Sequence, residues 1–312
     1  MRSARRRKLI EKKKKAVKNK SLFLKICLPI ILLIVAFLFI KLSIKYWNGT
    51  DKFSIVYKLD DGNVAVGVFD PKLEEITSLI IPGDTEVNLA RNFGTLRIKN
   101  VWQFGINEKI GGSLLASTVT QNFLFPVSLW SDSDAQSLYD ANALGIVRFV
   151  FFPKYTNISL GDRISVGLFA LKIKNLNKNL IDIGKSQFLS KQKLNDGEEG
   201  YTLSGTISPR LTAYFSDNSF AASNTGKSLR VEIKDMTGKP GVADKIGEIV
   251  EAMGGKVVSI NKTDTEDSDC IVSGMDSEVI KKVTRLFDCR SGSDSGGFDL
   301  KIELGQAFAE RF

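Results

Sequence analysis

Many nucleophilic and metal-dependent sites need histidine, cysteine or both. The chain of 312 residues contains no histidine and three cysteines. Without histidine, serine and cysteine nucleophiles lose their usual base, and zinc sites lose their commonest ligand. Cys270 and Cys289 are too far apart for a paired-cysteine metal motif, and neither common glycine-rich phosphate loop occurs. We therefore expect no cofactor and no metal site of these classes.

Cys270 and Cys289 instead indicate a structural role. Cys270 begins a predicted strand, and Cys289 follows the predicted helix that returns antiparallel to that strand. The end of the helix and the start of the strand should therefore lie close together. Two interpretations stay open: a disulfide, which would stabilise the fold by ~3 kcal/mol in the chain-entropy model, or two unpaired buried thiols. The third cysteine, Cys27, lacks the small preceding residues of a lipid attachment site and is interpreted as a buried apolar residue.

The segments around these two cysteines alternate between strand and helix patterns. Strand patterns occur at 229–235, 256–260, 270–274 and 298–304. Two apolar stripes of helical period separate them, formed by Val242, Ile246, Ile249, Val250 and Met253, and by Val279, Ile280, Val283, Leu286 and Phe287. The order strand, helix, strand, strand, helix, strand predicts a split βαβ, ferredoxin-like domain at 229–312.

The same segment resembles a known family. Its phrases Arg230-Val231-Glu232-Ile233, Pro240-Gly241-Val242-Ala243, Gly254-Gly255-Lys256 and Ile302-Glu303-Leu304-Gly305 are similar to the C-terminal domain of LytR-CpsA-Psr cell-envelope proteins. The glycines and the apolar period serve turns and packing, so they imply a fold without pointing to chemistry. An unrelated small α/β domain is the alternative interpretation.

The N-terminal residues 1–20 carry almost all of the net charge. They contain eleven Lys and Arg against one Glu, which gives +10, while the whole chain is +9. The rest of the chain therefore sums to −1. This excludes a basic body that binds nucleic acid, and it makes the tail a signal for membrane topology.

Residues 21–40 are apolar except for Ser21 and Lys25. Twenty helical residues at ~1.5 Å each span the ~30 Å hydrocarbon layer. The positive-inside rule then predicts a cytoplasmic tail at 1–20, a single transmembrane signal anchor at 21–45 in the cell membrane, and an extracytoplasmic remainder. A cleaved signal peptide is disfavoured because the run is too long and no small-residue cleavage pattern follows. Lys41, Lys45, Tyr46 and Trp47 are predicted to be anchors at the lipid interface.

Residues 51–216 again have an α/β pattern. Strands are predicted at 53–59, 64–69, 76–81 and 180–183, helices at 114–123 and 160–171, and a turn at 195–197. The small polar residues of 217–228 form a predicted linker. The fold class is therefore α/β (α+β), with a transmembrane helix followed by two extracytoplasmic domains.

The first of these domains resembles the amino-terminal part of the LytR-CpsA-Psr catalytic domain. The family pattern of strand, Asn-Pro turn, strand and Pro-Arg-Asp-Thr corresponds here to Asp70-Pro71 and Pro82-Gly83-Asp84-Thr85. The resemblance implies transfer of glycopolymers from a polyprenyl pyrophosphate carrier to peptidoglycan, with arginines that hold the pyrophosphate beside magnesium. Asp84, Thr85 and Arg97 are the candidate catalytic residues. Further candidate phosphate contacts are Arg91, Lys99, Arg148 and Arg163.

The motif departs from the family pattern at two places. Gly83 replaces an arginine, and loss of one preorganised cation typically removes ~3 kcal/mol of transition-state stabilisation. The expected Arg-x-x-Arg-Gln segment does not occur in 131–228. Asp60 and Asp61 lie near the place of the family's acidic metal ligand, but in a turn where aspartate is common anyway. Magnesium is therefore expected only if the domain is a transferase.

These observations predict a membrane-anchored, extracytoplasmic cell-envelope protein that binds or scaffolds cell-wall material without catalysis. Its expected partners are the membrane and either cell-wall glycan or a polyprenyl pyrophosphate lipid, and not nucleic acid. The alternative is a divergent phosphotransferase that attaches glycopolymers to peptidoglycan with Asp84 and further basic residues.

Overall fold

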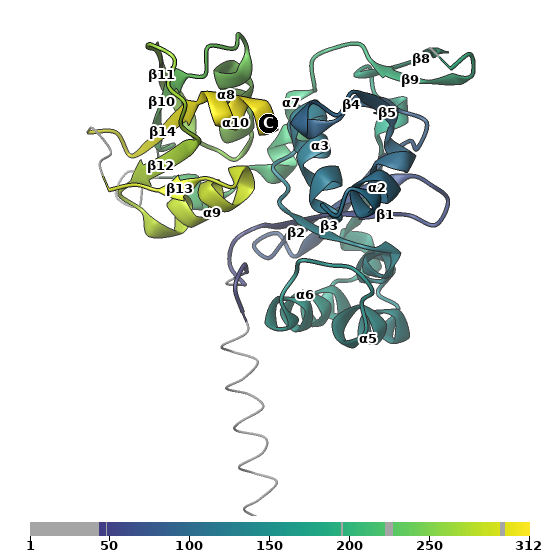
Figure 1. Cartoon of the computed structure of the whole chain (residues 1–312). Coiled ribbons are helices and arrows are strands. Elements are labelled where there is room, and N and C mark those ends of the chain that lie inside the picture. The colour runs from purple at the N-terminus through teal and green to yellow at the C-terminus, as the bar shows by residue number, and fades with distance from the viewer. Residues whose placement is uncertain (1–43, 48, 195, 222–226, 294–296) are drawn as a thin grey trace, which may run out of the picture.

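Figure 1 shows the computed structural model of the chain, which describes residues 44–47, 49–194, 196–221, 227–293 and 297–312. The predicted tail at 1–20, Cys27, nearly all of the predicted anchor at 21–45 and the middle of the predicted linker lie outside these residues. Within the described ranges, no helix has both the length and the hydropathy needed to cross a bilayer. The described residues form two larger sheets, each with its own helices.

A five-stranded sheet lies at the centre of the first domain. Its strand order is β6 (Leu129–Ser131), β1 (Phe53–Lys58), β2 (Val64–Asp70), β3 (Glu75–Ile81) and β7 (Lys178–Asp182). Strands β1, β2 and β3 form an antiparallel meander, while β6 and β7 join its two edges as parallel strands. The predicted strands at 53–59, 64–69, 76–81 and 180–183 match four of these five to within two residues.

Two cores lie on opposite faces of this sheet, because successive side chains of a strand point to opposite faces. In β1, Val56 enters one core, while Ile55 and Tyr57 enter the other. The central strand β2 is buried along its whole length, as expected of a strand covered on both faces. The helices that cover the sheet are α2 (Ile98–Asn107) and α3 (Ser113–Phe123) on one face, and α4 (Gln136–Asp140), α5 (Ala143–Phe151) and α6 (Leu160–Lys172) on the other (Figure 1).

Two small hairpins complete the first domain. They consist of β4 (Glu86–Asn88) with β5 (Thr95–Arg97), and β8 (Leu189–Lys193) with β9 (Glu199–Leu203), and the short helix α7 (Pro209–Thr212) follows them. The predicted turn at 195–197 lies in the connection between β8 and β9. Tyr201 in β9 donates its backbone N–H to the carbonyl of Asp84 over 3.1 Å, so the second hairpin lies beside the 82–85 motif.

The carboxylate of Asp162 holds the first described residues of the chain. Ser159 caps the N-terminus of α6 by accepting a hydrogen bond from the backbone N–H of Asp162 over 3.2 Å. The fully buried Asp162 side chain accepts hydrogen bonds from the backbone N–H groups of Lys45, Tyr46 and Trp47 over 3.0 to 3.3 Å. These N–H groups replace the water that the buried charge has lost.

Trp47 therefore packs on the protein core, and the prediction that it is an anchor at the lipid interface is wrong. For Lys45 and Tyr46, which are not buried, it stays a prediction. Trp47 is 5% exposed, and its ring lies 5.7 Å from Phe53 and 5.5 Å from Phe169. The guanidinium of Arg285 lies 4.1 Å from the centre of the Tyr46 ring. An aromatic residue that covers a protein core has the same local sequence pattern as one that lies in a lipid interface, so the sequence did not separate the two.

The second domain has a five-stranded sheet and three helices. The strand order is β11 (Lys256–Lys262), β10 (Arg230–Met236), β14 (Leu300–Gly305), β12 (Cys270–Gly274) and β13 (Arg290–Ser291). The helices are α8 (Val242–Ala252), α9 (Ser277–Phe287) and α10 (Gln306–Arg311). Both predicted apolar stripes contribute to its core, and Phe220, from the predicted linker, is buried there as well.

The strand order differs from the predicted ferredoxin-like topology. A split βαβ unit has another strand between its two parallel strands, whereas β10 pairs directly with β11, and the last strand β14 lies between β10 and β12. Leu300, Ile302 and Leu304 of β14 are fully buried, which favours an interior place over the edge place that a ferredoxin-like order would give this strand. Both topologies have nearly the same order of elements along the chain, so the order alone could not decide between them.

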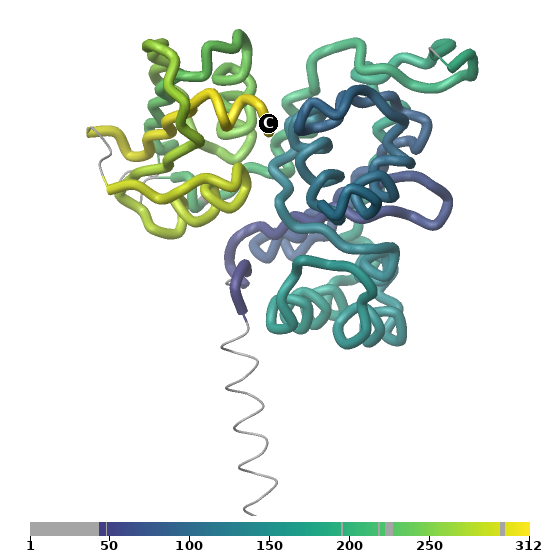
Figure 2. The backbone as a smooth tube through the Cα atoms, in the orientation of Figure 1, coloured from purple at the N-terminus to yellow at the C-terminus, as the bar shows by residue number. Residues whose placement is uncertain are grey.

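The two domains contact each other through α9 and α10, and the C-terminal end lies between them (Figure 2). In α9, the Nζ atom of Lys282 lies 2.6 Å from Oδ2 of Asp51 and 3.0 Å from Oδ2 of Asp217. The side-chain amide of Asn92 donates to the carbonyl of Glu310 over 2.9 Å. One lysine of the second domain thus binds the start of the first domain and the start of the predicted linker together.

A disulfide joins Cys270 at the start of β12 to Cys289 just after α9, with their Cα atoms 4.9 Å apart. Arg311 of α10 lies over this end of the domain. Its guanidinium donates to the carbonyl groups of Phe287 and Asp288 over 2.9 Å each. The disulfide therefore connects the strand and the helix at the end of the second domain that faces the first.

We expect the double substitution Cys270→Ser and Cys289→Ser to lower the free energy of unfolding by ~3 kcal/mol, because the bond closes a loop of 19 residues in sequence. Urea denaturation of the full chain in detergent micelles measures the effect. A reducing agent should destabilise the wild-type chain by a similar amount and leave the double variant unchanged. Equal stability of the oxidised wild type and the variant would contradict the prediction.

Candidate functional site

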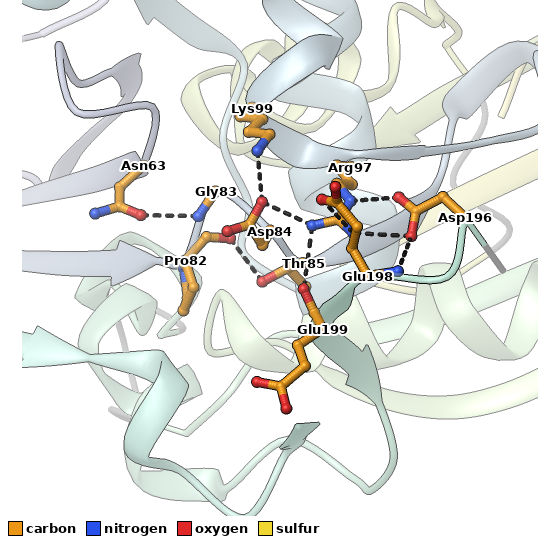
Figure 3. A network of polar contacts seen from close by, with 10 residues as sticks. All are labelled: Asn63, Pro82, Gly83, Asp84, Thr85, Arg97, Lys99, Asp196, Glu198 and Glu199. Atoms are coloured by element: carbon orange, nitrogen blue, oxygen red, sulfur yellow. Dashed lines mark hydrogen bonds and ion pairs between the residues drawn. The ribbon is translucent and has the colours of Figure 1, made fainter. Parts of the chain in front are cut away.

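The motif Pro82-Gly83-Asp84-Thr85 forms the turn between β3 and β4 (Figure 3). Thr85 closes this turn, because its backbone N–H and its hydroxyl both donate to the carbonyl of Pro82, over 3.0 and 2.7 Å. Its side chain is fully buried. Thr85 therefore holds the conformation of the turn and does not present its hydroxyl to a ligand.

Gly83 is enclosed by the turn between β1 and β2. Its N–H donates to Oδ1 of Asn63 over 2.8 Å, and its carbonyl accepts from the backbone N–H of Lys99 over 3.1 Å. A Cβ atom at position 83 would collide with the carbonyl oxygen of Gly62 and would lie 2.9 Å from its carbonyl carbon. The backbone of the β1–β2 turn therefore lies where the side chain of the family's arginine would begin.

Arg97, at the end of β5, is the centre of the polar network in Figure 3. Its side chain is only 9% exposed. Nε and Nη2 donate to the two carboxylate oxygens of Asp196 over 2.8 and 2.9 Å, and Nη1 donates to Oδ1 of Asp84 over 2.8 Å and to the carbonyl of Glu199 over 3.2 Å. An oxygen of Glu198 lies 3.7 Å from Nη2. The guanidinium thus makes four hydrogen bonds within the protein.

Lys99 is the second cation of this network. Its Nζ atom lies 2.6 Å from the same Asp84 oxygen that Arg97 binds. The network therefore contains two cations, Arg97 and Lys99, and three carboxylates, Asp84, Asp196 and Glu198, which gives a formal charge of 2 − 3 = −1. A phosphate group would have to displace Asp196 or Asp84 before it could bind Arg97, whereas Lys99 is 41% exposed and, among the described residues, is paired only with Asp84.

The hydrogen bonds of the network also fix its charge state. The ammonium of Lys99, followed by the guanidinium of Arg97, holds the pKa of the Asp84 carboxyl below its usual range. Arg97 lowers the pKa of Asp196 to about 2. Asp196 and Asp84 in turn raise the pKa of Arg97. Asp84 and Asp196 are therefore ionised at neutral pH, and neither is suited to act as a general acid.

The other three predicted phosphate contacts lie away from Asp84. On α5, Nε of Arg148 lies 3.0 Å from Oδ1 of Asp134. On α6, Arg163 donates to the carbonyl of Phe149 over 3.2 Å, and burial lowers its pKa. Arg91 lies in the 3₁₀ turn at Ala90–Asn92, which contacts α10 of the second domain. The structure thus brings only Arg97 and Lys99 of the five candidates to Asp84.

The predicted acidic pair at 60–61 caps its own turn. The carboxylate of Asp61 accepts hydrogen bonds from the backbone and side-chain N–H groups of Asn63 over 2.9 and 2.8 Å. In the part of the chain that the structure describes, no group of three or more Asp, Glu or Cys residues is arranged to hold a metal ion.

A cleft between the two domains is a second polar site, which the sequence did not predict. Its volume is about 280 Å³. One wall is a single face of α3, where Ser113, Ala116, Ser117 and Thr120 follow the i, i+3, i+4, i+7 spacing of a helix. The rest of the lining is formed by Tyr46, Arg91, Val127, Ser128, Asn157, Arg285, Leu286, Phe287, Asp288, Arg311 and Phe312.

The three arginines of the cleft differ in their contacts. Arg311 is paired with Asp269, with Nη2 2.8 Å from Oδ1. Arg285 contacts the Tyr46 ring and donates to the carbonyl of Lys45 over 3.2 Å. These contacts hold its side chain in place, but it has no carboxylate partner among the described residues. Arg91 is exposed and makes neither a hydrogen bond nor an ion pair within the described ranges. Arg91 and Arg285 therefore outnumber Asp288, the one aspartate in the lining, and leave the cleft with an excess of positive charge.

In the sequence, Arg91 is one of several candidate phosphate contacts, with nothing to indicate which other residues it would meet. The serine and threonine spacing on α3 is a local signal that could have indicated a polar helix face. The contributions of Arg285 and Arg311 could not have been found in this way, because they depend on how the second domain packs against the first.

No protein-family model and no curated protein matches the sequence. Solved structures similar to the chain include Bacillus subtilis TagT, with 15% identity and a TM-score of 0.36 over 51% of this chain and 87% of TagT. They also include B. subtilis TagV (12%, 0.36, 51% and 92%) and Lin1025 from Listeria innocua (13%, 0.34, 50% and 92%). One TagT structure is described as a LytR-CPS2A-Psr family protein with bound octaprenyl pyrophosphate lipid. The structural neighbours of this chain are thus LytR-CPS2A-Psr proteins that match about half of it, and similarity at this level assigns no activity.

We expect Gly83→Ala to destabilise the first domain by about 1–3 kcal/mol, because the added methyl group overlaps the backbone of Gly62. Thermal and chemical unfolding of the full chain measure this change. Gly205→Ala is the matched control, because the nearest atom to its Cβ would be at an ordinary 3.4 Å. Equal stability of the two variants would show that the β1–β2 turn yields easily and that position 83 is not closed.

The Arg97 network also predicts a pH dependence. A carboxyl whose pKa is lower in the folded state than in the unfolded state contributes stability above the unfolded pKa of ~3.9 and loses it as the pH falls through the folded value. Asp196 should therefore stay ionised down to about pH 2. In Arg97→Gln its pKa should rise toward the ordinary value, whereas Lys99→Gln should leave it low, because Lys99 contacts Asp84. Carboxyl ¹³C NMR titration measures both, and a low pKa for Asp196 in Arg97→Gln would contradict the prediction.

Proposed function

We propose that the chain is a membrane-anchored, extracytoplasmic cell-envelope protein that binds anionic cell-wall polymer in the cleft between its two domains and does not catalyse transfer. The observation that carries the proposal is the contrast between two sets of cations. Arg97 and Lys99, at the motif, are neutralised by three carboxylates, whereas Arg91 and Arg285, in the cleft, have no carboxylate partner among the described residues.

The motif lacks what phosphoryl transfer from a diphosphate requires. The transition state spreads negative charge over several oxygens, and preorganised cations stabilise it. Here Arg97 donates four hydrogen bonds to the protein itself, and the backbone of Gly62 closes position 83 to an arginine side chain. The formal charge of −1 around Asp84 would also repel a phosphate group.

The cleft has the composition of a site for a phosphorylated or otherwise acidic glycan. The exposed Ser117 of α3 lines the cleft together with the cationic side chains, and polymer oxygens can accept hydrogen bonds from both. The hydroxyls of Ser113 and Thr120 donate instead to carbonyl groups of the protein. Phe312, in the opposite wall, is half-buried and adds apolar surface on which a sugar ring can pack, whereas Phe287 is only 3% exposed. Asp288 is the one aspartate in the lining and adds one negative charge, so the positive charges of the arginines exceed it.

The membrane location is part of the same proposal. It rests on the basic residues 1–20 and the apolar residues 21–40, which lie outside the described residues. With the N-terminus in the cytoplasm, both domains would face the cell wall, where the disulfide between Cys270 and Cys289 is stable. No cofactor enters the proposal, and magnesium would belong only to the alternative, a divergent phosphotransferase.

We expect Arg91→Ala to weaken binding of soluble poly(glycerol phosphate) about tenfold or more, because a charge-assisted hydrogen bond contributes ~1.5–3 kcal/mol and each 1.4 kcal/mol is tenfold in affinity. Titration of the full chain in nanodiscs, followed by thermal stability, gives the dissociation constants. Arg210→Ala is the matched control, because this exposed arginine lines a different cavity. Binding should also weaken with salt.

Two results would overturn the proposed function. One is that poly(glycerol phosphate) does not bind, or binds Arg91→Ala as tightly as the wild type. The other is that a polyprenyl pyrophosphate stabilises the chain only with magnesium and that Asp84→Asn abolishes this stabilisation. The second result would place a carrier-lipid site at the motif and would support the transferase.

A further inference from the structure

Helices α5 and α6 expose an unusual number of large apolar side chains. We call this surface the apolar face. On α5 and the residues after it, the exposed fractions are 83% for Leu144, 50% for Val147, 57% for Phe151, 72% for Phe152 and 50% for Tyr155, and on α6 they are 56% for Leu168 and 48% for Leu171. Contiguous exposed apolar residues in a folded domain indicate a surface that contacts a partner or a membrane.

The helical register separates these residues from the core. On α5, Ile146, Phe149 and Val150 are buried, while Leu144, Val147 and Phe151 follow at i, i+3 and i+7 on another side of the helix. On α6, Val166 and Ala170 are buried, while Leu168 and Leu171 are exposed. Both helices therefore have one apolar side for the core and a second apolar side that nothing in the described chain covers.

Positive charge accompanies this face. Residues 141–180 contain six basic residues and one acidic residue, for a net charge of 6 − 1 = +5. The one acidic residue is Asp162, which is fully buried. Lys154, Lys172 and Lys174 are exposed. Apolar side chains with lysines beside them match the two components of an anionic lipid surface, acyl chains and negative headgroups.

The place where the described chain begins fits a membrane below this face. Asp162, in the first turn of α6, binds the backbone of residues 45–47, and Figure 1 shows α5 and α6 at the end of the molecule where the described chain starts. The apolar run within the predicted anchor ends at residue 40, and five residues of chain reach at most ~18 Å. A helix of the length of α6 spans ~20 Å. The bilayer surface that holds the anchor is therefore within reach of the apolar face.

We propose that the apolar face lies in the interfacial layer of the membrane, with Leu144, Phe152 and Leu168 among the acyl chains and the lysines at anionic headgroups. The first domain would then contact the bilayer over α5 and α6 in addition to its transmembrane anchor. The proposal does not depend on which ligand occupies the cleft between the domains.

The test uses the full chain with Cys27→Ser, reconstituted in vesicles of phosphatidylcholine and phosphatidylglycerol. A nitroxide is attached at Leu144→Cys or Leu168→Cys, while the disulfide stays intact. The matched control is Val258→Cys on β11, which is 41% exposed and belongs to the second domain. Collision rates with oxygen, which enters lipid, and with a water-soluble nickel complex are read from the electron paramagnetic resonance signal.

We expect labels at 144 and 168 to collide several-fold less often with nickel than the label at 258, and more often with oxygen. Lys172→Glu with Lys174→Glu should move both labels toward the behaviour of the control. Nickel collisions as frequent at 144 and 168 as at 258 would overturn the proposal. So would protection from nickel together with spin–spin broadening that disappears when labelled chains are diluted with unlabelled ones, because a second copy would then cover the face.

Discussion

The polar edge of the first domain depends on the hydrogen bonds that the guanidinium of Arg97 makes. This guanidinium joins three segments that are far apart in sequence: its own strand β5, the motif turn through Asp84, and the β8–β9 connection through Asp196 and Glu199. A buried guanidinium is stable only when its donors are satisfied, so the loop that carries Asp196 has to lie over the motif. The same bonds that hold the hairpin in place use four hydrogen-bond donors of the guanidinium.

The sequence predicted the local secondary structure well. It predicted poorly which strands lie side by side and which distant side chains meet. Short apolar runs bounded by turn residues located β1, β2 and β3, and helical stripes located α3, α6, α8 and α9, because each pattern records burial within a short segment. Two partners of Arg97, Asp196 and Glu199, lie about a hundred positions away, and no local pattern connects them to it. The same limit explains the strand order of the second domain, where the burial of Leu300, Ile302 and Leu304 decided between two topologies with nearly the same element order.

The cleft shows why the candidate site could be predicted only in part. Its α3 wall and Arg91 belong to the first domain, but Arg285 and Arg311 reach it only because α9 and α10 pack against that domain. Lys282 stabilises this packing through carboxylates from the start of the first domain and from the start of the linker. A site made by domain packing is recorded in contacts between distant residues. It is not visible in the composition of any one segment.

The attachment of residues 45–47 to Asp162 has a mechanical consequence. Three consecutive backbone N–H groups meet one buried carboxylate, and the neighbouring indole of Trp47 is packed against two phenylalanine rings. Tension that enters the chain at residue 44 is therefore borne by α6 and by this aromatic cluster before it reaches the edge of β1. The sheet, and with it the network around Arg97, is shielded from tension applied at that residue.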